Sequence, residues 1–356
     1  MQRRPHECPD CRETSDQPNR REFLRTASVA AAGAAVGGGL APTFARAKDT
    51  AAAASAGKTP ETLVKVLYDT LTDTQKKAVC FDWNHHDPKR GLLRTFVANN
   101  WHITPQFLIT HKNPFYTDEQ RDIVRKIFEG IIRPEWHARI DKQLEDDAGG
   151  FGHEQSLAIF GKPGDGKFEF VMTGRHMTLR CDGNSTDHVA FGGPIFYGHA
   201  AEDFNEAADH PGNVFWPQAV SANKLYQMLD GKQRKLALID RSPREQASGF
   251  RSPSEFQGLP VGELSADQKE HLQGVLKMLL DPYRTDDQAE AMACLKSQGG
   301  LDKCNLSFYR DSDIGNDQVW DNWRLEGPAF VWYFRGKPHV HVWVHVADDP
   351  SVKLNA

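Results

Sequence analysis

The last strongly patterned stretch of the chain alternates between valine and larger side chains. Residues 339–346 read His-Val-His-Val-Trp-Val-His-Val. Side chains of a β-strand point alternately to the two faces of a sheet. The pattern therefore predicts a strand with a valine face for the core and an opposite face of His339, His341, Trp343 and His345. That opposite face needs a special environment, because an open solvent face rarely carries three imidazoles and an indole without Lys or Glu.

Further strands are expected in the middle and at the end of the chain. Residues 156–160 and 167–173 flank a turn rich in Gly and Pro, which predicts a hairpin. Residues 176–181, 188–191 and 328–334 show similar strand patterns, and a tight turn at 335–337 leads into the last strand. Amphipathic helices stand apart from these mainly antiparallel strands, so the predicted fold class is α+β.

One helix-start pattern recurs at four places. A capping side chain precedes a glutamine by three positions, as in a capping box, in residues 72–75, 117–120, 230–233 and 265–268. The first and third copies also share a preceding Leu-Tyr-x-x-Leu, at residues 67–71 and 225–229. This indicates either an internal duplication or repeated use of a good helix cap. The irregular spacing of the copies excludes a solenoid.

The N-terminus reads as an export signal. Residues 19–25 resemble a twin-arginine motif with Arg20 and Arg21, and a weakly apolar run and an A-x-A site ending at Ala47 follow. We expect residues 1–47 to be a twin-arginine signal peptide that engages the twin-arginine export machinery. The mature protein is then periplasmic or extracellular, after cleavage near Ala47. The alternative is a single membrane anchor, but the run is too rich in Ala and Gly for a stable membrane span. Residues 48–57 read as a linker and residues 58–356 as one α+β domain.

Composition indicates a globular protein and argues against one that binds nucleic acid through a broad positive charge. The chain has 356 residues, of which 39% are hydrophobic and 26% charged, and its net charge is −5. These values are typical of a globular protein and give no basic field for nucleic acid. Histidine is over-represented, at 15 residues. The predicted signal peptide favours a metal-binding role for some of these histidines, because proteins that cross the membrane folded often carry a bound metal or redox group.

His339 and His341 are the first candidate metal ligands. Their β-carbons lie about 7 Å apart on one strand face, which suits two ligands of one ion. The alternative is a half-buried edge face whose histidines bond to nearby loops. His345 is a weaker candidate, because it lies two strand steps further on. Zinc, copper and iron all remain open.

Other residues join this candidate site if the strands share one sheet. His176 and His199 belong to polar or glycine-rich segments that could converge on the His-x-His pair. Glu326 is placed to act as a further ligand or as a general base on metal-bound water. Tyr197 could donate a proton or a hydrogen bond, and Arg180 could pair with an anionic substrate or with Asp182. For Glu326, Tyr197 and Arg180 the alternative is an ordinary structural contact.

The cysteines raise a separate question. After signal cleavage Cys80, Cys181, Cys294 and Cys304 would reach an oxidising compartment. Cys294 and Cys304 enclose a short loop with two glycines, so a local disulfide is one of the two states we expect there. Pairing of Cys80 with Cys181 is a further option.

Several motifs together resemble an uncharacterised exported bacterial family, number 3500 in the domain-of-unknown-function series. They are the export signal, Phe-Gly-Gly-Pro-x-Phe-x-Gly ending at Gly198, Gly-x-His at 174–176, Leu-x-x-x-Gln-Arg around Gln233 and the terminal His-x-His. The resemblance runs from about residue 60 to the end. In the commoner pattern of that family a second histidine follows His176, where this chain has Met177. The resemblance implies no known activity.

Two function classes follow from these residues. The first is an exported metalloenzyme that hydrolyses or oxidises a small polar molecule, whose identity the sequence does not give. The second is a non-catalytic periplasmic protein that binds a ligand or sequesters a metal. A closed sphere of four protein ligands favours the second class, and an open position beside a pocket favours the first.

Overall fold

The computed structural model describes residues 59–200 and 212–352. Residues 57–356 group into one compact unit. The predicted signal peptide of residues 1–47 and the linker of residues 48–57 lie outside the described residues. Among the described residues, no helix combines the length and the apolar character needed to cross a bilayer.

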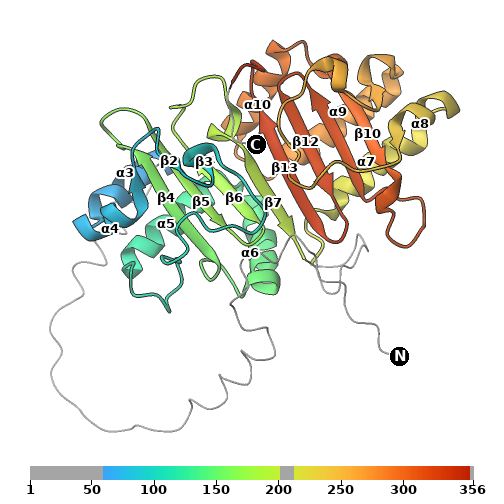
Figure 1. The fold of residues 1–356 in the computed structure, drawn as a ribbon. Coiled ribbons are helices and arrows are strands. Elements are labelled where there is room, and N and C mark those ends of the chain that lie inside the picture. Colours follow the sequence, from blue (N-terminus) through green and yellow to red (C-terminus); the bar gives the residue numbers. More distant parts are fainter. Residues whose placement is uncertain (1–58, 201–211, 353–356) are drawn as a thin grey trace, which may run out of the picture. The chain divides into compact units, whose positions relative to one another are not determined.

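A mixed, mostly antiparallel sheet of 11 strands forms the centre of the unit (Figure 1). The strand order is β1-β4-β5-β6-β7-β13-β12-β11-β10-β8, and β9 pairs with β10. The strands are β1 Cys80–Phe81, β4 Gln155–Gly161, β5 Phe168–Gly174, β6 Met177–Cys181, β7 Ile195–His199, β8 Leu238–Ile239, β9 Leu259–Pro260, β10 Asn305–Tyr309, β11 Asn322–Gly327, β12 Phe330–Arg335 and β13 Val340–Val346. A small separate sheet pairs β2, His86–Asp87, with β3, Gly91–Leu92.

The helices are segregated from the strands in sequence, which confirms the α+β class. They are α3 Pro60–Thr70, α4 Asp73–Val79, α5 Asp118–Ile131, α6 Pro134–Ala148, α7 Trp216–Met228, α8 Gly231–Ala237, α9 Ala266–Leu280 and α10 Thr285–Ser297. All four predicted capping boxes are present, at the starts of α4, α5, α8 and α9. Each box satisfies N–H groups that a helix start leaves without partners.

The valine face of β13 packs in the main hydrophobic core, as its alternation predicts. Val340, Val342, Val344 and Val346 are at most 3% exposed and cluster with residues of the helices. The helices cover this face of the sheet, and we call it the helical face. In Figure 1 they lie behind the strands, while the hairpin of β2 and β3 and other connecting segments cross in front.

The two halves of the unit repeat one arrangement. A helix pair, a short edge strand, a second helix pair and four strands follow one another in both halves, and the last strands, β7 and β13, pair in the middle of the sheet. In the first half the capping glutamines Gln75 and Gln120 bond to each other, with Nε2 of Gln75 2.8 Å from Oε1 of Gln120. In the second half Gln233 and Gln268 make the same bond at 3.0 Å. These matched long-range bonds favour duplication over repeated use of a good cap.

The repeat extends to the edges of the sheet. β1 pairs in parallel with β4, and β8 pairs in parallel with β10 in the same way. Nε2 of Gln120 donates to the carbonyl of Thr70, and Nε2 of Gln268 donates to that of Met228. Each carbonyl lies two positions before the capping residue of the next short helix. The sheet therefore consists of two structurally equivalent halves.

The opposite face of the sheet, which we call the loop face, is polar yet buried. Long segments after β1 and β8 cover it. From the first segment, Trp101 Nε1 donates to Thr178 Oγ1 at 2.9 Å. From the second, the carbonyl of Ala247 accepts from Arg324, and that of Pro243 accepts from Tyr333 at 3.1 Å. These hydrogen bonds offset the cost of burying the polar groups that make them and hold the covering segments against this face.

Two predicted elements differ from the structure. His176 lies in the turn between β5 and β6, with φ of 52°, rather than in the strand predicted for 176–181. Residues 188–191 do not form a strand, since His188 and Phe191 have φ values of 71° and 61° and a 3-10 turn, Ala190–Gly192, begins within them. These left-handed conformations are incompatible with an extended strand.

The four cysteines of the described residues are free thiols. The disulfide considered for Cys294 and Cys304 is thus absent from the structure, as is a bond between Cys80 and Cys181. Sγ of Cys304 packs where a Cβ on Gly327 would stand, only 2.8 Å from that position. Its side chain points to the start of the β11–β12 turn.

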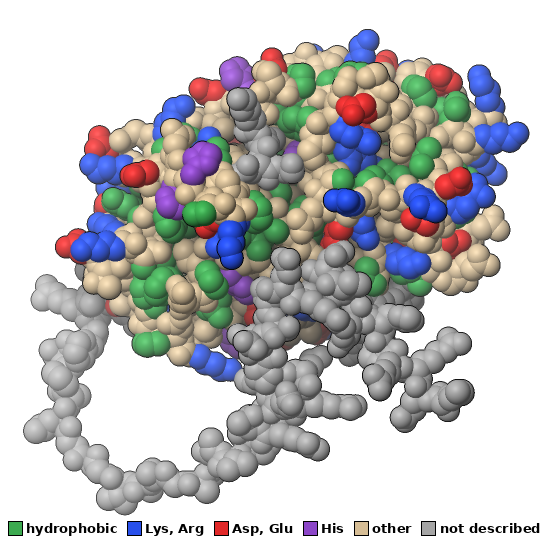
Figure 2. All heavy atoms as spheres, in the orientation of Figure 1, with side chains coloured by type: hydrophobic (Ala, Val, Ile, Leu, Met, Phe, Trp, Pro, Cys, Tyr) green, Lys and Arg blue, Asp and Glu red, His purple; other side chains and the backbone are tan. Residues whose placement is uncertain are grey.

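The surface carries charges of both signs. On the face shown in Figure 2, Lys and Arg side chains are interspersed with Asp and Glu side chains. This face therefore presents no broad field of one sign, of the kind that attracts polyanions.

Candidate metal centre

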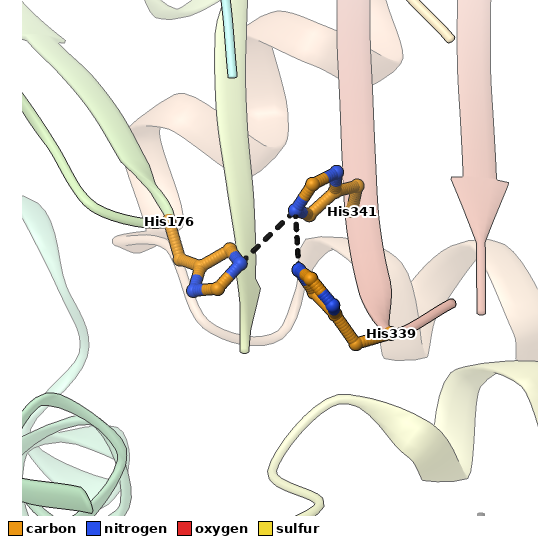
Figure 3. A group of neighbouring side chains, drawn as sticks. All are labelled: His176, His339 and His341. Carbon is orange, nitrogen blue, oxygen red and sulfur yellow. Dashed lines mark hydrogen bonds between the residues drawn. The ribbon is translucent and has the colours of Figure 1, made fainter. Parts of the chain in front are cut away.

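Three histidines meet on the loop face (Figure 3). Nε2 of His341 lies 3.0 Å from Nε2 of His176 and 2.8 Å from Nε2 of His339. One ligand atom from each residue lies within 4.8 Å of the others. All three side chains are buried, with residue exposures of 2%, 7% and 1% for His176, His339 and His341. We call this group the His triad.

The local sequence explains how His176 reaches the other two. It sits in the two-residue turn after β5, and its backbone N–H donates to Asn100 Oδ1 at 2.8 Å. Gly198 of β7 lies between His176 and β13, where it pairs with His341. A Cβ on Gly198 would stand 3.1 Å from Cδ2 of His176 and 2.1 Å from the carbonyl oxygen of Val340. The glycine therefore leaves room for the imidazole to cross.

Two carboxylates orient the triad from behind. Nδ1 of His176 bonds to Asp147 and Nδ1 of His341 bonds to Glu245. Because an ionised carboxylate only accepts, each Nδ1 must carry the proton, which leaves the Nε2 lone pair facing the other histidines. A carboxylate behind each imidazole is the usual second shell of metal-binding histidines.

Both carboxylates are buried and held in place. Their side chains are 2% and 5% exposed, for Asp147 and Glu245 respectively. Asp147 also accepts from Nε of Arg175 at 2.8 Å, and Glu245 accepts from Asn99 at 3.2 Å. Burial would raise the pKa of Asp147, but His176 and Arg175 hold it below its ordinary value. Asp147 is thus ionised at neutral pH.

His176 and His339 are neutral at neutral pH. Burial lowers the pKa of His176 to about 4, although Asp147 opposes the shift. Burial, with the charges of the neighbouring histidines and Arg175, lowers the pKa of His339 well below its ordinary value. Neutral imidazole is the form that binds a metal.

The donor set fits a divalent metal ion. Three imidazole nitrogens at about 2.0–2.1 Å from a tetrahedral ion stand roughly 3.3 Å apart. The Nε2 separations of 2.8 and 3.0 Å are shorter by a few tenths of an ångström, so slight opening of the rings admits the ion. Within the described residues no fourth His, Cys, Asp or Glu joins the group. The described residues therefore supply three protein ligands.

His199 and His345 do not join the triad. His199 follows Tyr197 on the helical face, where its ring stacks on Phe215 with centroids 6.0 Å apart. His345 is on the loop face but lies four residues beyond His341, about 13 Å along an extended strand. There it packs edge-on against Phe250, with centroids 6.0 Å apart.

Glu326 is committed to an ion-pair network away from the triad. Its Oε1 accepts from Arg251 and from Arg324, both at 2.7 Å. It pairs across the sheet with Val331, which in turn pairs with His345 rather than His341. The structure thus does not bring Glu326 to the triad as a ligand or base.

Tyr197 and Arg180 also have structural contacts. The hydroxyl of Tyr197 donates to Gln218 at 2.8 Å on the helical face, and burial raises its pKa. Arg180 pairs with Glu169 at 2.7 Å and donates to the carbonyl of Pro194 at 2.6 Å. Its partner is therefore Glu169 and not Asp182, and its contacts are those of the structural alternative.

A small cavity touches one member of the triad, His176. It has a volume of ≈ 20 Å³, which holds about one water molecule, and its other linings are mainly apolar side chains with the polar Gln143 and Tyr197. Neither His339 nor His341 lines it, and Met177, Leu179 and Tyr197 belong to the core under the helices. The cavity therefore lies on the helical face, beside His176 alone.

Asp147 and Glu245 were not identified from the sequence. They lie 29 and 96 positions from the histidines that they orient. Neither forms a motif with a histidine, since one ends a helix and the other lies in a long loop. Only the pairing of the strands brings them to the site.

The comparisons with known proteins identify a family but no activity. The sequence model of the family described as "Protein of unknown function (DUF3500)" matches residues 54–346. No curated protein and no solved structure matches the chain. The match covers most of the chain, including every residue of the triad and both carboxylates. The chain therefore belongs to the DUF3500 family of proteins of unknown function.

Proposed function

We propose that the protein is an enzyme that binds one divalent metal ion through His176, His339 and His341 and uses this ion in catalysis. The observation that carries the proposal is the meeting of three Nε2 atoms, two of them on imidazoles held by Asp147 and Glu245. Three imidazoles with one open position are typical of catalytic rather than structural sites. The reaction is hydrolysis or oxidation of a small polar molecule.

Two carboxylates position the ligands of the proposed metal ion. Asp147 and Glu245 fix the tautomer and orientation of two ligands, and the buried surroundings exclude bulk water. A bound ion of this kind supplies Lewis acidity, and it lowers the pKa of a coordinated water. Zinc, copper and iron all accept imidazole ligands, so the metal is named only by class.

A second candidate is a non-catalytic metal-binding protein. The deep burial of the triad favours it. A deeply buried site holds an ion well but admits few substrates. Turnover of a small substrate by the metal-loaded protein, lost on removal of the metal, separates the two candidates.

We propose in addition that the protein acts after export. The twin-arginine motif and the A-x-A site before residue 48 support this location. An exported protein that acquires its ion in the cytoplasm must cross the membrane folded, which is what the twin-arginine machinery permits.

Metal analysis of the mature protein, purified after export, tests the metal proposal. We expect about one equivalent of a transition metal in the unmutated protein and a loss of most of it in His339→Ala/His341→Ala. His111→Ala is the matched control, because that side chain is 78% exposed and pairs with Asp118 rather than with a member of the triad. A metal content below about 0.1 equivalent in the folded, unmutated protein would reject the proposal.

A further inference from the structure

Part of the long segment after β8 lies along β13, and we call this part, residues 242–251, the strap. Near its start Glu245 bonds to Nδ1 of His341. Further along, Phe250 packs edge-on against His345, with ring centroids 6.0 Å apart. His341 and His345 are four residues apart on β13. The strap therefore extends from the His triad toward the last residues of that strand.

Three charged residues fasten the strap to the sheet beyond Glu245. Arg251 of the strap bonds to Glu326 of β11, with its Nε 2.7 Å from Oε1. Arg324 of β11 donates to Glu326 at 2.7 Å and to the carbonyl of Ala247 in the strap. We call Arg251, Glu326 and Arg324 the clasp.

The first half of the unit has a matching arrangement. Arg180 of β6 pairs with Glu169 at 2.7 Å and donates to the carbonyl of Arg94 in the covering segment after β1. Arg94 in turn donates to Glu169 at 3.4 Å. The same segment carries Asn100, which accepts from the backbone N–H of His176. In each half, therefore, an Arg–Glu pair of the sheet holds a covering segment that contacts a ligand of the triad.

The closed strap buries polar atoms that have no partner. Phe250 covers His345, which is 1% exposed. Among the described residues, neither ring nitrogen of His345 has a hydrogen-bond partner, and neither does Nε of Arg324. Burial of such atoms costs free energy, and water can pair with them when the strap lifts. The clasp opposes this cost, so the balance of the two sets how often the strap opens.

We propose that the triad exchanges its metal ion when the strap lifts, and that the clasp controls how often this happens. This inference rests on the proposed metal centre. The three ligands are buried, so an ion leaves only when their surroundings open. Lifting of the strap also takes Glu245 away from His341 and frees that ring to turn from the other ligands. The clasp residues are thus positioning residues that act on the triad through the strap.

The clasp has a simpler role that the experiment must separate from this one. It could serve only to align Glu245 behind His341 in the closed state. Loss of the clasp would then raise the metal dissociation constant. If the clasp instead controls opening, its loss accelerates both entry and release of the ion and leaves their ratio nearly constant, since the closed state still dominates.

The test measures Zn²⁺ exchange in the mature protein and in Arg251→Gln. Arg251 is 29% exposed, and without it Glu326 keeps Arg324 as a partner. We expect release of Zn²⁺ to excess chelator and binding of added Zn²⁺ both to be about tenfold faster, the effect of about 1.4 kcal/mol, with the dissociation constant within about twofold. Arg310→Gln is the matched control, because Arg310 is 61% exposed and pairs with Asp240. Unchanged rates in Arg251→Gln would overturn the inference, and so would faster release with an equal rise in the dissociation constant.

His345→Leu tests the same balance in the opposite direction. It replaces the unpartnered ring nitrogens by an apolar side chain, so the closed strap becomes more stable. We expect Zn²⁺ exchange to be at least about threefold slower. Exchange that is not slowed would overturn the part assigned to His345.

Hydrogen exchange follows the strap without a metal. The amides of Ala247 and Ser248 donate within the strap to the carbonyls of Arg244 and Gln246, at 3.0 and 2.9 Å. In metal-free Arg251→Gln we expect these two amides to exchange about tenfold faster, while the amides of β13 keep their rates. Unchanged strap amides would overturn the opening itself. Failure of the unmutated protein to bind Zn²⁺ would instead reject the metal centre, so the two failures are distinguishable.

Discussion

His176 and His341 lie 165 positions apart in the chain, yet their Nε2 atoms are 3.0 Å apart and each is backed by a buried carboxylate. The two residues belong to different halves of the sheet. His176 and Asp147 come from the first half, and His339, His341 and Glu245 come from the second. A metal ion at the triad would therefore join the two structural repeats.

This placement predicts that metal removal destabilises the whole unit. An ion that binds only the folded state stabilises it by about 4 kcal/mol when its free concentration is 1,000 times the dissociation constant. Treatment with a chelator should therefore lower the melting temperature by several degrees. Calorimetry or circular dichroism measures this change. In His339→Ala/His341→Ala the chelator should have no effect, and an equal shift there would show that the ion acts elsewhere.

The carboxylates predict a graded loss of metal affinity. Asp147→Asn and Glu245→Gln leave the three ligands in place but remove the negative charge that holds the Nδ1 proton, and the amide oxygen that remains is a weaker acceptor. We expect metal affinity to fall about 10- to 100-fold in each, as measured by competition with a chromophoric chelator. Asp146→Asn is the control, because the neighbouring Asp146 pairs with Lys142 at the surface. An affinity within about twofold of the unmutated protein in both variants would contradict the second-shell role.

Gly198 predicts a steric effect at the same site. A methyl group there would meet the carbonyl of Val340 at 2.1 Å and the ring of His176 at 3.1 Å. We expect Gly198→Ala to lower the free energy of unfolding by about 1–3 kcal/mol or more and to weaken metal binding by moving His176. Gly274→Ala is the matched control, since nothing lies within 4 Å of its added Cβ in α9. That change should stabilise the protein by about 0.5–1 kcal/mol, and denaturant titration of both variants checks the sign.

We expect the free energy of unfolding to depend on pH through Glu290, which is not part of the metal centre. Burial, with the charges of Asp182 and Asp287, raises the pKa of Glu290 from 4.5 to about 7, against the N–H of Phe191. Because the folded state favours the protonated acid, its contribution is fully present below pH 4.5 and is lost as the pH rises through about 7. Unfolding midpoints measured between pH 5 and 8 should fall less in Glu290→Gln than in the unmutated protein. Glu270→Gln is the control, because Glu270 is exposed. An equal change of the unfolding midpoint with pH in Glu290→Gln and the unmutated protein would contradict the role of Glu290.

The export proposal predicts a loss of transport. Lys substitution of both Arg20 and Arg21 should leave the protein in the cytoplasm with its N-terminal segment uncleaved, because the machinery reads the arginine pair. Fractionation and mass spectrometry of the N-terminus check this. Normal cleavage of the Arg20→Lys/Arg21→Lys protein would show that another export route is used.

Much of the fold is predictable because its signals are local. The alternation of β13 and the capping boxes of α4, α5, α8 and α9 depend on residues within a few positions of one another. They give the fold class, the buried valine face and the histidine pair His339 and His341. The repeated Leu-Tyr-x-x-Leu before two of the boxes is the local sign of a duplication, and the matched element order, edge strands and glutamine bonds of the structure favour duplication over repeated use of a good cap.

The rest of the site depends on strand order and strand face, which local patterns do not give. His176 lies in the turn just before β6, and only β7 stands between β6 and β13. Gly198 of β7 has no side chain, so the ring of His176 can pass over β7 to His341. His199 is excluded because it points to the helical face, one residue beyond Gly198. Glu326 shares the loop face, but the register places it level with His345 and not with His341. Asp147 and Glu245 carry no local signal at all.

Anomalous diffraction from crystals grown with Zn²⁺ tests directly whether the His triad binds a metal ion. We expect one strong peak between the three histidines, about 2.0–2.1 Å from each Nε2 atom, with Asp147 and Glu245 still bonded to Nδ1 of His176 and His341. Protein exposed to excess Zn²⁺ in which the Nε2 atoms stay in contact, with no peak between them, would contradict metal binding by the triad.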